Sequence, residues 1–130
     1  MHIIRNRGRL IAGALLLALS CGAAVAQGYP AKPVRLILPF PPGAPNDTVG
    51  RALGQKLSEQ LGENVVAENR PGAGGNVGIG VAAMSAPDGY TLVLATPGIA
   101  ISPSLYAKLN YDARDLAPVA RVSTIQTPQA

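Results

Sequence analysis

The spacing of apolar and polar residues predicts that strands and helices alternate along this chain. The run over residues 34–39 is apolar apart from Arg35, which is typical of a strand buried in a parallel sheet. After a turn, apolar residues recur at helical spacing with polar residues between them, at Val49, Leu53, Leu57 and Leu61. We expect Asn46 or Asp47 to cap this helix at its start and Gly62 to end it.

The second part of the pattern repeats this order. Residues 64–68 predict a second strand, and a glycine-rich turn leads into a helix with an apolar stripe of Val77, Val81 and Met84. The elements expected beyond it are a strand over 90–96, a short helix over about 103–109 and a fourth strand near 119–123. Strands joined by helices of this length imply right-handed crossovers. The sequence therefore predicts an α/β fold with a doubly wound, mostly parallel sheet.

In such a sheet the turns that follow the strands meet at one edge, and here three turns of similar composition meet there. Residues 40–47, 69–76 and 96–102 are rich in glycine, proline and short polar side chains. Helix N-termini at this edge direct unpaired N–H groups and positive dipole ends into one space, which suits an anion. Ordinary strand-to-helix turns use the same residues, but three at one edge favour a site. Arg70 could pair with an anionic ligand or with Glu68.

The first 26 residues have the pattern of a secretory signal peptide. Cleavage is expected after Ala26. The parts of the signal are a basic start with Arg5, Arg7 and Arg9, an apolar run over 10–19, and the small residues Ala24, Val25 and Ala26. Cys21 leaves a second possibility, a lipoprotein anchored through that cysteine, although Leu19 stands one place later than such a motif prefers. The sequence thus predicts export from the cytoplasm.

Charge and residue content narrow the chemistry of what remains. The chain has a formal net charge of +4, but three of its 11 Lys and Arg residues and none of its 7 acids lie in the signal. Residues 27–130 therefore carry a net charge of +1, and nucleic-acid binding loses its electrostatic support. The only His and the only Cys also lie in the signal. Residues 27–130 thus lack the groups for a His or thiolate metal site, a Ser-His-Asp triad or a cysteine nucleophile.

Two motif-like features remain, and both fit structural roles better than catalytic ones. The GxGxxA string over residues 78–83 falls inside the predicted helix and lacks the acid that a dinucleotide site requires downstream. Asp47 could be a catalytic carboxylate, yet its place at a helix start fits a cap better. An exported enzyme, which would depend on a few scattered carboxylates and lysines, is the weaker hypothesis.

Three specific strings carry a resemblance to a known family: PFPPG at 39–43, ENRPGAGGN at 68–76 and APDGYTL at 86–92. The chain, from Tyr29 to about Val122, resembles the Bug-type (TctC-like) substrate-binding receptors of the tripartite tricarboxylate transporters. The resemblance implies a periplasmic protein with the type II periplasmic binding protein fold, whose two lobes close on a small carboxylate. A di- or tricarboxylate, an amino acid or an aromatic acid would then pass to the membrane permease subunits of the transporter. No catalytic step, cofactor or metal is implied.

The resemblance also assigns ligand-binding positions to the three turns, largely through backbone N–H groups and bound water. These positions are Pro42, Gly43, Ala44, Pro45, Asn46 and Asp47 in the first turn, Gly72, Ala73, Gly74, Gly75 and Asn76 in the second, and Thr96, Gly98 and Ser102 in the third. Two of them depart from the family pattern. Ala44 replaces a second glycine, and Ser102 stands where an asparagine is common.

Receptors of this family are longer than the present chain. We therefore expect residues 27–130 to be the N-terminal part of the first lobe, with the second lobe and the return segments of the first lobe missing. The alternative is a truncated remnant that does not bind, because closure around a ligand requires two lobes and a hinge.

Overall fold

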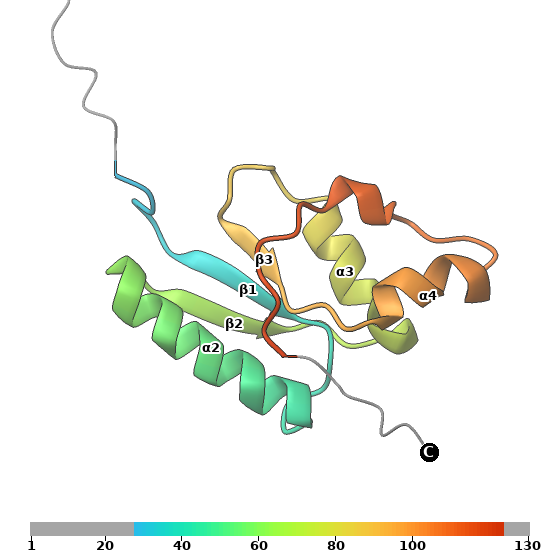
Figure 1. Ribbon diagram of the computed structural model, residues 1–130, viewed down its shortest axis with the longest axis horizontal. Helices are drawn as coiled ribbons and strands as arrows, with labels where there is room; N and C mark the ends of the chain where they lie inside the picture. The colour runs from blue at the N-terminus through green and yellow to red at the C-terminus, as the bar shows by residue number, and fades with distance from the viewer. Residues whose placement is uncertain (1–27, 124–130) are drawn as a thin grey trace, which may run out of the picture.

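The computed structural model describes residues 28–123 and shows a parallel sheet packed between helices (Figure 1). Three strands form the sheet in the order β2-β1-β3: β1 (Val34–Leu38), β2 (Val65–Asn69) and β3 (Thr91–Val93). The helices are α2 (Pro45–Leu61), α3 (Asn76–Ala83) and α4 (Gly98–Leu105), with 3-10 turns η1 (Ala73–Gly75) and η2 (Ala113–Asp115). Both strand pairs are parallel, which confirms the predicted α/β class.

The central strand β1 is the middle of the core, and helices cover it from both sides. Ile37 and Leu38 are fully buried. A Cβ added to Gly54 of α2 would lie 3.6 Å from Leu36 Cδ2, whereas one added to Gly78 of α3 would lie 2.8 Å from the Cβ of Pro39. Because alternate residues of a strand point to opposite faces, α2 and α3 lie on opposite faces of the sheet. The sheet is therefore doubly wound, as predicted.

Helix α2 packs through glycines, which the apolar pattern did not indicate. Its buried residues are Asp47, Gly50 and Gly54, while Val49 of the predicted stripe is 46% exposed. The glycines let the helix backbone rest directly on the leucines of β1, which turns the predicted stripe partly towards solvent. Gly62 ends the helix in the left-handed conformation, with φ of 72°, as expected.

The start of α2 corrects the predicted cap. The N-cap residue is Ala44, no side chain caps the helix, and Pro45 occupies the first turn, where its missing N–H and fixed φ are tolerated. Neither Asn46 nor Asp47 is the cap. Instead, Asp47 Oδ2 accepts a hydrogen bond of 2.9 Å from the Gly43 N–H, which lies before the helix.

Helix α3 also differs from its predicted orientation. Val77 and Met84 of the expected stripe are 44% and 66% exposed. The buried residues are instead Asn76, Gly78, Ile79, Gly80 and Ala82. The small residues on that face allow close approach to the sheet, and Ile79 is the large apolar side chain that is buried there, while Val77 and Met84 stay at the surface.

Two predictions for the C-terminal part were wrong. Helix α4 begins at Gly98 instead of near residue 103, and Pro103 lies inside it. Residues 119–123 form no strand; they have no strand pairing partner among the described residues, and Val119 is 82% exposed. The predicted third strand is present but is limited to Thr91–Val93.

The predicted signal peptide, its cleavage site and Cys21 lie outside the described residues. Within residues 28–123, no helix has both the length and the apolar character that crossing a membrane requires.

Candidate functional site

The parallel sheet brings the ends of its strands together at one edge. The Arg70 N–H donates to the Leu38 carbonyl at 2.8 Å, and the Leu94 N–H donates to the Ile37 carbonyl at 3.0 Å. These bonds continue the ladder past the carboxyl end of each outer strand. The segments that follow β1, β2 and β3 therefore all begin at the same edge, as the sequence predicted.

Asn69, the last residue of β2, joins the first turn to the second. Its Nδ2 donates to the Phe40 carbonyl at 3.0 Å and to Asp47 Oδ1 at 2.8 Å, and its Oδ1 accepts from Arg51 Nη2 at 2.7 Å. Arg51 Nε also lies 3.0 Å from Asp47 Oδ1. One amide thus fixes the position of residues 40–47 against the end of β2.

The carboxyl group of Asp47 is the centre of this network, and only 5% of the residue is exposed. Hydrogen bonds from Asn69, from the Gly43 N–H and from Arg51 lower the pKa of Asp47 to about 2. The carboxylate is therefore ionised at neutral pH, and all its near partners are donors within the protein. This arrangement suits a residue that holds the turn and does not suit a general base.

Sequence reasoning had not assigned Asn69 or Arg51 to the site. A signal for Arg51 was present, because it follows Asp47 by four residues on a helix, which is the spacing of an ion pair. Asn69 carried a weaker signal as a polar residue at the end of an otherwise buried strand segment.

The second turn has a run of left-handed backbone conformations. The φ angles of Gly72, Ala73, Gly74 and Gly75 are 132°, 47°, 66° and 99°. Ala73 is the only non-glycine residue with positive φ among the described residues. Glycine adopts these conformations readily, so the chain can turn sharply here before α3 begins.

The supply of free backbone donors differs between the first two turns. Pro42 and Pro45 have no N–H, the Gly43 N–H is used by Asp47, and the Ala44 N–H donates to the Pro41 carbonyl at 3.2 Å. Within residues 28–123, five N–H groups of these two turns donate to no acceptor, those of Phe40, Asn46, Gly72, Ala73 and Gly74. Three of them lie where a helix starts, Asn46 in the first turn of α2 and Ala73 and Gly74 in η1 directly before α3, and these are the donors best placed for a ligand.

The third turn is shorter than predicted because α4 begins within it. Gly98 is the first residue of α4, and the Thr96 carbonyl accepts from the Ile99 N–H at 3.1 Å. Ser102 lies in the helix, 5% exposed, and its carbonyl accepts from the Tyr106 N–H at 3.0 Å. Thr96 and Gly98 therefore stay at the edge, while Ser102 is a buried helix residue.

Arg70 is engaged within the protein. Its Nε donates to Glu68 Oε1 at 2.7 Å, and Arg35 binds the other oxygen of the same carboxylate at 2.8 Å. Hydrogen bonds from Arg35 and then from Arg70 lower the pKa of Glu68. Of the two roles considered for Arg70, the structure shows the pairing with Glu68.

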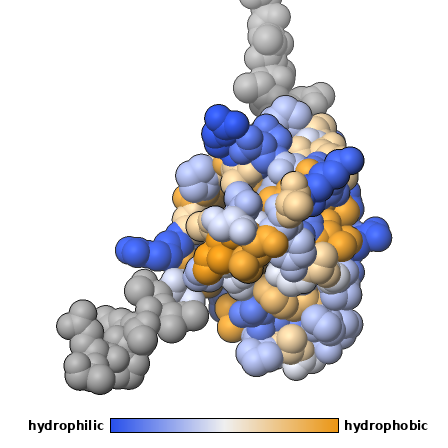
Figure 2. Space-filling view, turned by 90° about the vertical axis from the view of Figure 1, so that its right-hand side faces the viewer, coloured by the Kyte–Doolittle hydropathy of each residue, from blue (hydrophilic) through white to orange (hydrophobic). Residues whose placement is uncertain are grey.

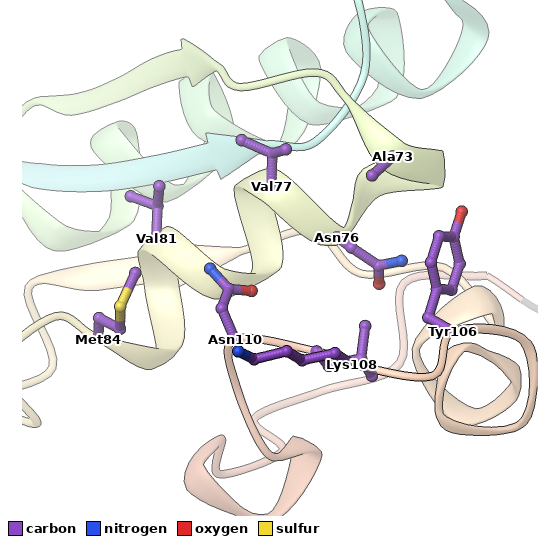
Figure 3. A pocket seen from close by; sticks show the side chains of 9 residues that line it. Ala73, Asn76, Val77, Val81, Met84, Tyr106, Lys108 and Asn110 are labelled. Carbon is purple, nitrogen blue, oxygen red and sulfur yellow. The ribbon is translucent and has the colours of Figure 1, made fainter.

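Beside α3 lies a hollow of about 450 Å³, called the α3 groove below. Its lining consists of Ala73, Tyr106, residues 108–110, Asn76, Val77 and Val81 of α3, and Met84 directly after α3 (Figure 3). Of the predicted site residues, Ala73 and Asn76 line it. Asn76 is 5% exposed, and its Oδ1 accepts a hydrogen bond of 2.6 Å from Tyr111. The Asn76 Nδ2 is buried without a partner among the described residues.

Fold and edge geometry together define part of an α/β ligand-binding lobe of the periplasmic binding protein type. The sequence of residues 49–128 matches the family model of the tripartite tricarboxylate transporter family receptor (TctC), and the chain belongs to this family. It is similar to the protein BugT of Bordetella pertussis, with 40% identity over 126 residues that cover 92% of this chain and 39% of BugT.

Solved structures agree with this assignment. The periplasmic binding protein BugD is 43% identical, with a TM-score of 0.62 over 65% of this chain and 28% of BugD. An R. palustris protein solved with adipate is 36% identical, with a TM-score of 0.62 over 66% of this chain and 29% of that protein. The chain spans about two fifths of the length of the curated relatives it matches.

Proposed function

We propose that this chain is part of a periplasmic solute-binding receptor that captures a small carboxylate for the membrane permease subunits of a tripartite tricarboxylate-type transporter. The family assignment supports the receptor role. Similar proteins have been solved with adipate and with malate, both of which are carboxylates. The single observation that carries the proposal is that unused N–H groups lie at two helix starts at the shared edge of the sheet, on Asn46, Ala73 and Gly74.

The chemistry of these donors fits a carboxylate. The Asn46 N–H lies in the first turn of α2, and those of Ala73 and Gly74 precede α3, so positive helix ends support both groups. Asp47 would repel an anion if it were unpaired. The Arg51 guanidinium neutralises its charge, and the Asn69 amide holds its carboxylate in place. Asp47 in this proposal shapes the first turn and does not contact the ligand.

The remaining positions assigned by the resemblance have secondary roles in this proposal. Pro42, Gly43, Ala44 and Pro45 form the wall of the first turn, Gly72 and Gly75 allow the backbone of the second to approach, and Thr96 and Gly98 flank them. Asn76 and Ser102 are buried and would contribute only through small movements. Recognition by backbone N–H groups specifies a carboxylate and leaves the rest of the ligand to other contacts.

Calorimetric titration of the protein with malate, citrate, glutamate and benzoate tests this function. We expect heat of binding with at least one of these acids. We also expect Gly74→Val to weaken binding more than Arg70→Gln, because valine is strained at a φ of 66° whereas Arg70 is already paired with Glu68. No heat with any acid, or the opposite order of the two variants, would contradict the proposal.

A further inference from the structure

The side-chain amide of Asn69 lies where the first two turns of the candidate site meet. Asn69 is the last residue of β2 and pairs with Leu38 of β1, so both side chains point to the same face of the sheet. Helix α2 covers that face, because a Cβ added to Gly50 of α2 would collide with the Leu38 side chain. The second turn begins with the next residue of the chain. Asn69 thus reaches the start of α2 with its side chain and the second turn with its backbone.

Burial does little to hold these two turns in place. Residues 41–43 of the first turn and 71–74 of the second are exposed. Figure 2 shows the side of the molecule on which α2 and α3 begin, where hydrophilic side chains lie around the apolar ones. A turn that lies in water keeps one conformation only if specific bonds offset its conformational entropy. Hydrogen bonds to the turns are therefore what can fix their geometry.

Asn69 supplies such bonds to the first turn and to α2. Its Nδ2 donates to the Phe40 carbonyl and to the Asp47 carboxylate, and its Oδ1 accepts from Arg51. Both amide hydrogens and the oxygen are used, so a flip of the amide would break all three bonds. The Asp47 carboxylate also accepts from the Gly43 N–H, which extends the same network to the middle of the turn. The amide therefore has one arrangement, and the turn is held against it.

The N–H groups proposed to bind a carboxylate lie next to these fixed points. Asn46 directly precedes Asp47, so the backbone that carries its N–H is held where the Asp47 side chain is anchored. Ala73 and Gly74 belong to the turn that follows Asn69. A change at the Asn69 side chain would shift the first donor relative to the other two. One carboxylate could then no longer reach both helix starts.

The other polar features at this edge do not make this link. Glu68 pairs with Ile37 in the sheet, so its ion pairs with Arg35 and Arg70 lie on the face opposite α2. The α3 groove is lined by residues of the second turn and by none of the first. Within residues 28–123, the hydrogen bonds that join residues 40–47 to β2 are both made by the Asn69 amide.

We propose that Asn69 is a positioning residue of the anion site, which sets the distance between the donor at the start of α2 and the donors before α3. This inference rests on the proposed function, because it concerns how the same N–H groups come to face one ligand. Asn69 does not contact the ligand and acts through Asp47 and the Phe40 carbonyl. Its loss should therefore weaken binding by the folded protein, and not only lower its stability.

The test uses calorimetric titration with whichever of malate, citrate, glutamate and benzoate the parent protein binds most tightly. Asn69→Ala should weaken binding about tenfold, the lower end of what loss of an orienting residue costs in metal sites, with the number of binding sites unchanged. Asn64→Ala is the matched control, because it removes the same amide from an exposed position just before the same strand, and it should bind as the parent does. Fewer sites at an unchanged Kd would show a structural role alone and overturn the inference.

A double-mutant cycle tests the route through Asp47. The combined variant Asn69→Ala, Asp47→Ala should lose less affinity than the product of the two single losses, because both act on one network. Losses that multiply would mean independent effects and would contradict the inference. If Asn69→Ala does not unfold cooperatively, Asn69→Ser, which keeps one hydroxyl donor, replaces it, with Asn64→Ser as its control.

The outcomes separate this inference from the proposed function. If the parent protein binds an acid and Asn69→Ala binds it as tightly as Asn64→Ala does, the positioning role is wrong and the receptor function stands. If the parent protein binds none of the four acids, the proposed function fails, and this inference fails with it.

Discussion

Gly78 is the position where adding a single methyl group should destabilise the folded protein most. A Cβ there would lie 2.8 Å from the Arg70 carbonyl oxygen, 2.8 Å from Pro39 Cβ and 2.9 Å from Pro39 Cα. Two of these atoms belong to the backbone and the third to a buried proline ring, so none can rotate away. Gly78→Ala must therefore push α3 away from the ends of β1 and β2, where the candidate site lies.

The magnitude follows from two opposing terms. Overpacking of this kind costs about 1–3 kcal/mol, and rigid neighbours place Gly78 near the upper end. Replacing glycine by alanine inside a helix stabilises the helix by about 1 kcal/mol at most, which offsets part of this cost. We expect a net loss of about 2 kcal/mol in the free energy of unfolding. For a domain of this size that lowers the Tm by roughly 8–16 °C.

Gly80→Ala is the matched control in the same helix. Its Cβ would approach the Asn110 side chain at 2.8 Å, but Asn110 is exposed and its amide can move aside. We expect its unfolding free energy to stay within about 1 kcal/mol of the parent protein. Urea unfolding followed by circular dichroism measures both variants. A Gly78→Ala protein as stable as Gly80→Ala would refute the packing argument.

Three further predictions concern α2, the network at Asp47 and the N-terminus. Gly54→Ala should raise the free energy of unfolding by about 0.5–1 kcal/mol in thermal or urea unfolding, because its Cβ would make only contacts of 3.6 Å or longer; a loss of stability would contradict this. The pKa of Asp47 is lowered from 3.8 to about 2 in the folded state, so its stabilising effect is complete above pH 4 and is lost as the pH falls towards 2; Asp47→Asn should flatten the dependence of Tm on pH in that window, and an unchanged slope would count against the network. Edman sequencing of the exported protein should begin at Gln27, and a lipid-modified Cys21 at the N-terminus would show the alternative to be correct.

The sequence predicted the fold well where the signal came from one strand or one turn. The apolar run at 34–39 identified the central strand, and Gly62 identified the end of α2, because each depends on local chemistry. The three turns at the carboxyl edge followed from the parallel order alone. These features required no knowledge of which helix face meets the sheet.

The helix faces could not be predicted in the same way. Periodicity assigns the large apolar residues to the core, whereas α2 and α3 approach the sheet through Gly50, Gly54 and Gly78, which carry no hydrophobic signal. Val77 and Met84 were consequently placed on the wrong side. Glycine spacing becomes informative only once the neighbouring strand residues are known.

The candidate site, like the fold, could be predicted from the sequence only in part. Its location and its glycine-rich composition were visible in the sequence, but the number of free donors was not. That number depends on which N–H groups are used internally, as when Asp47 binds the Gly43 N–H. The link through Asn69 joins residues 22 positions or more apart, and no local pattern indicates it.

In the proposed function, backbone N–H groups at the carboxyl edge hold a carboxylate. Titration of the ¹⁵N-labelled protein with malate, followed by amide chemical shifts, tests it most directly. We expect the largest shifts at Asn46, Ala73 and Gly74, while the amide signal of Gly54, inside α2, stays in place. Binding of malate with those three signals unmoved, or with no signal moving at all, would contradict it.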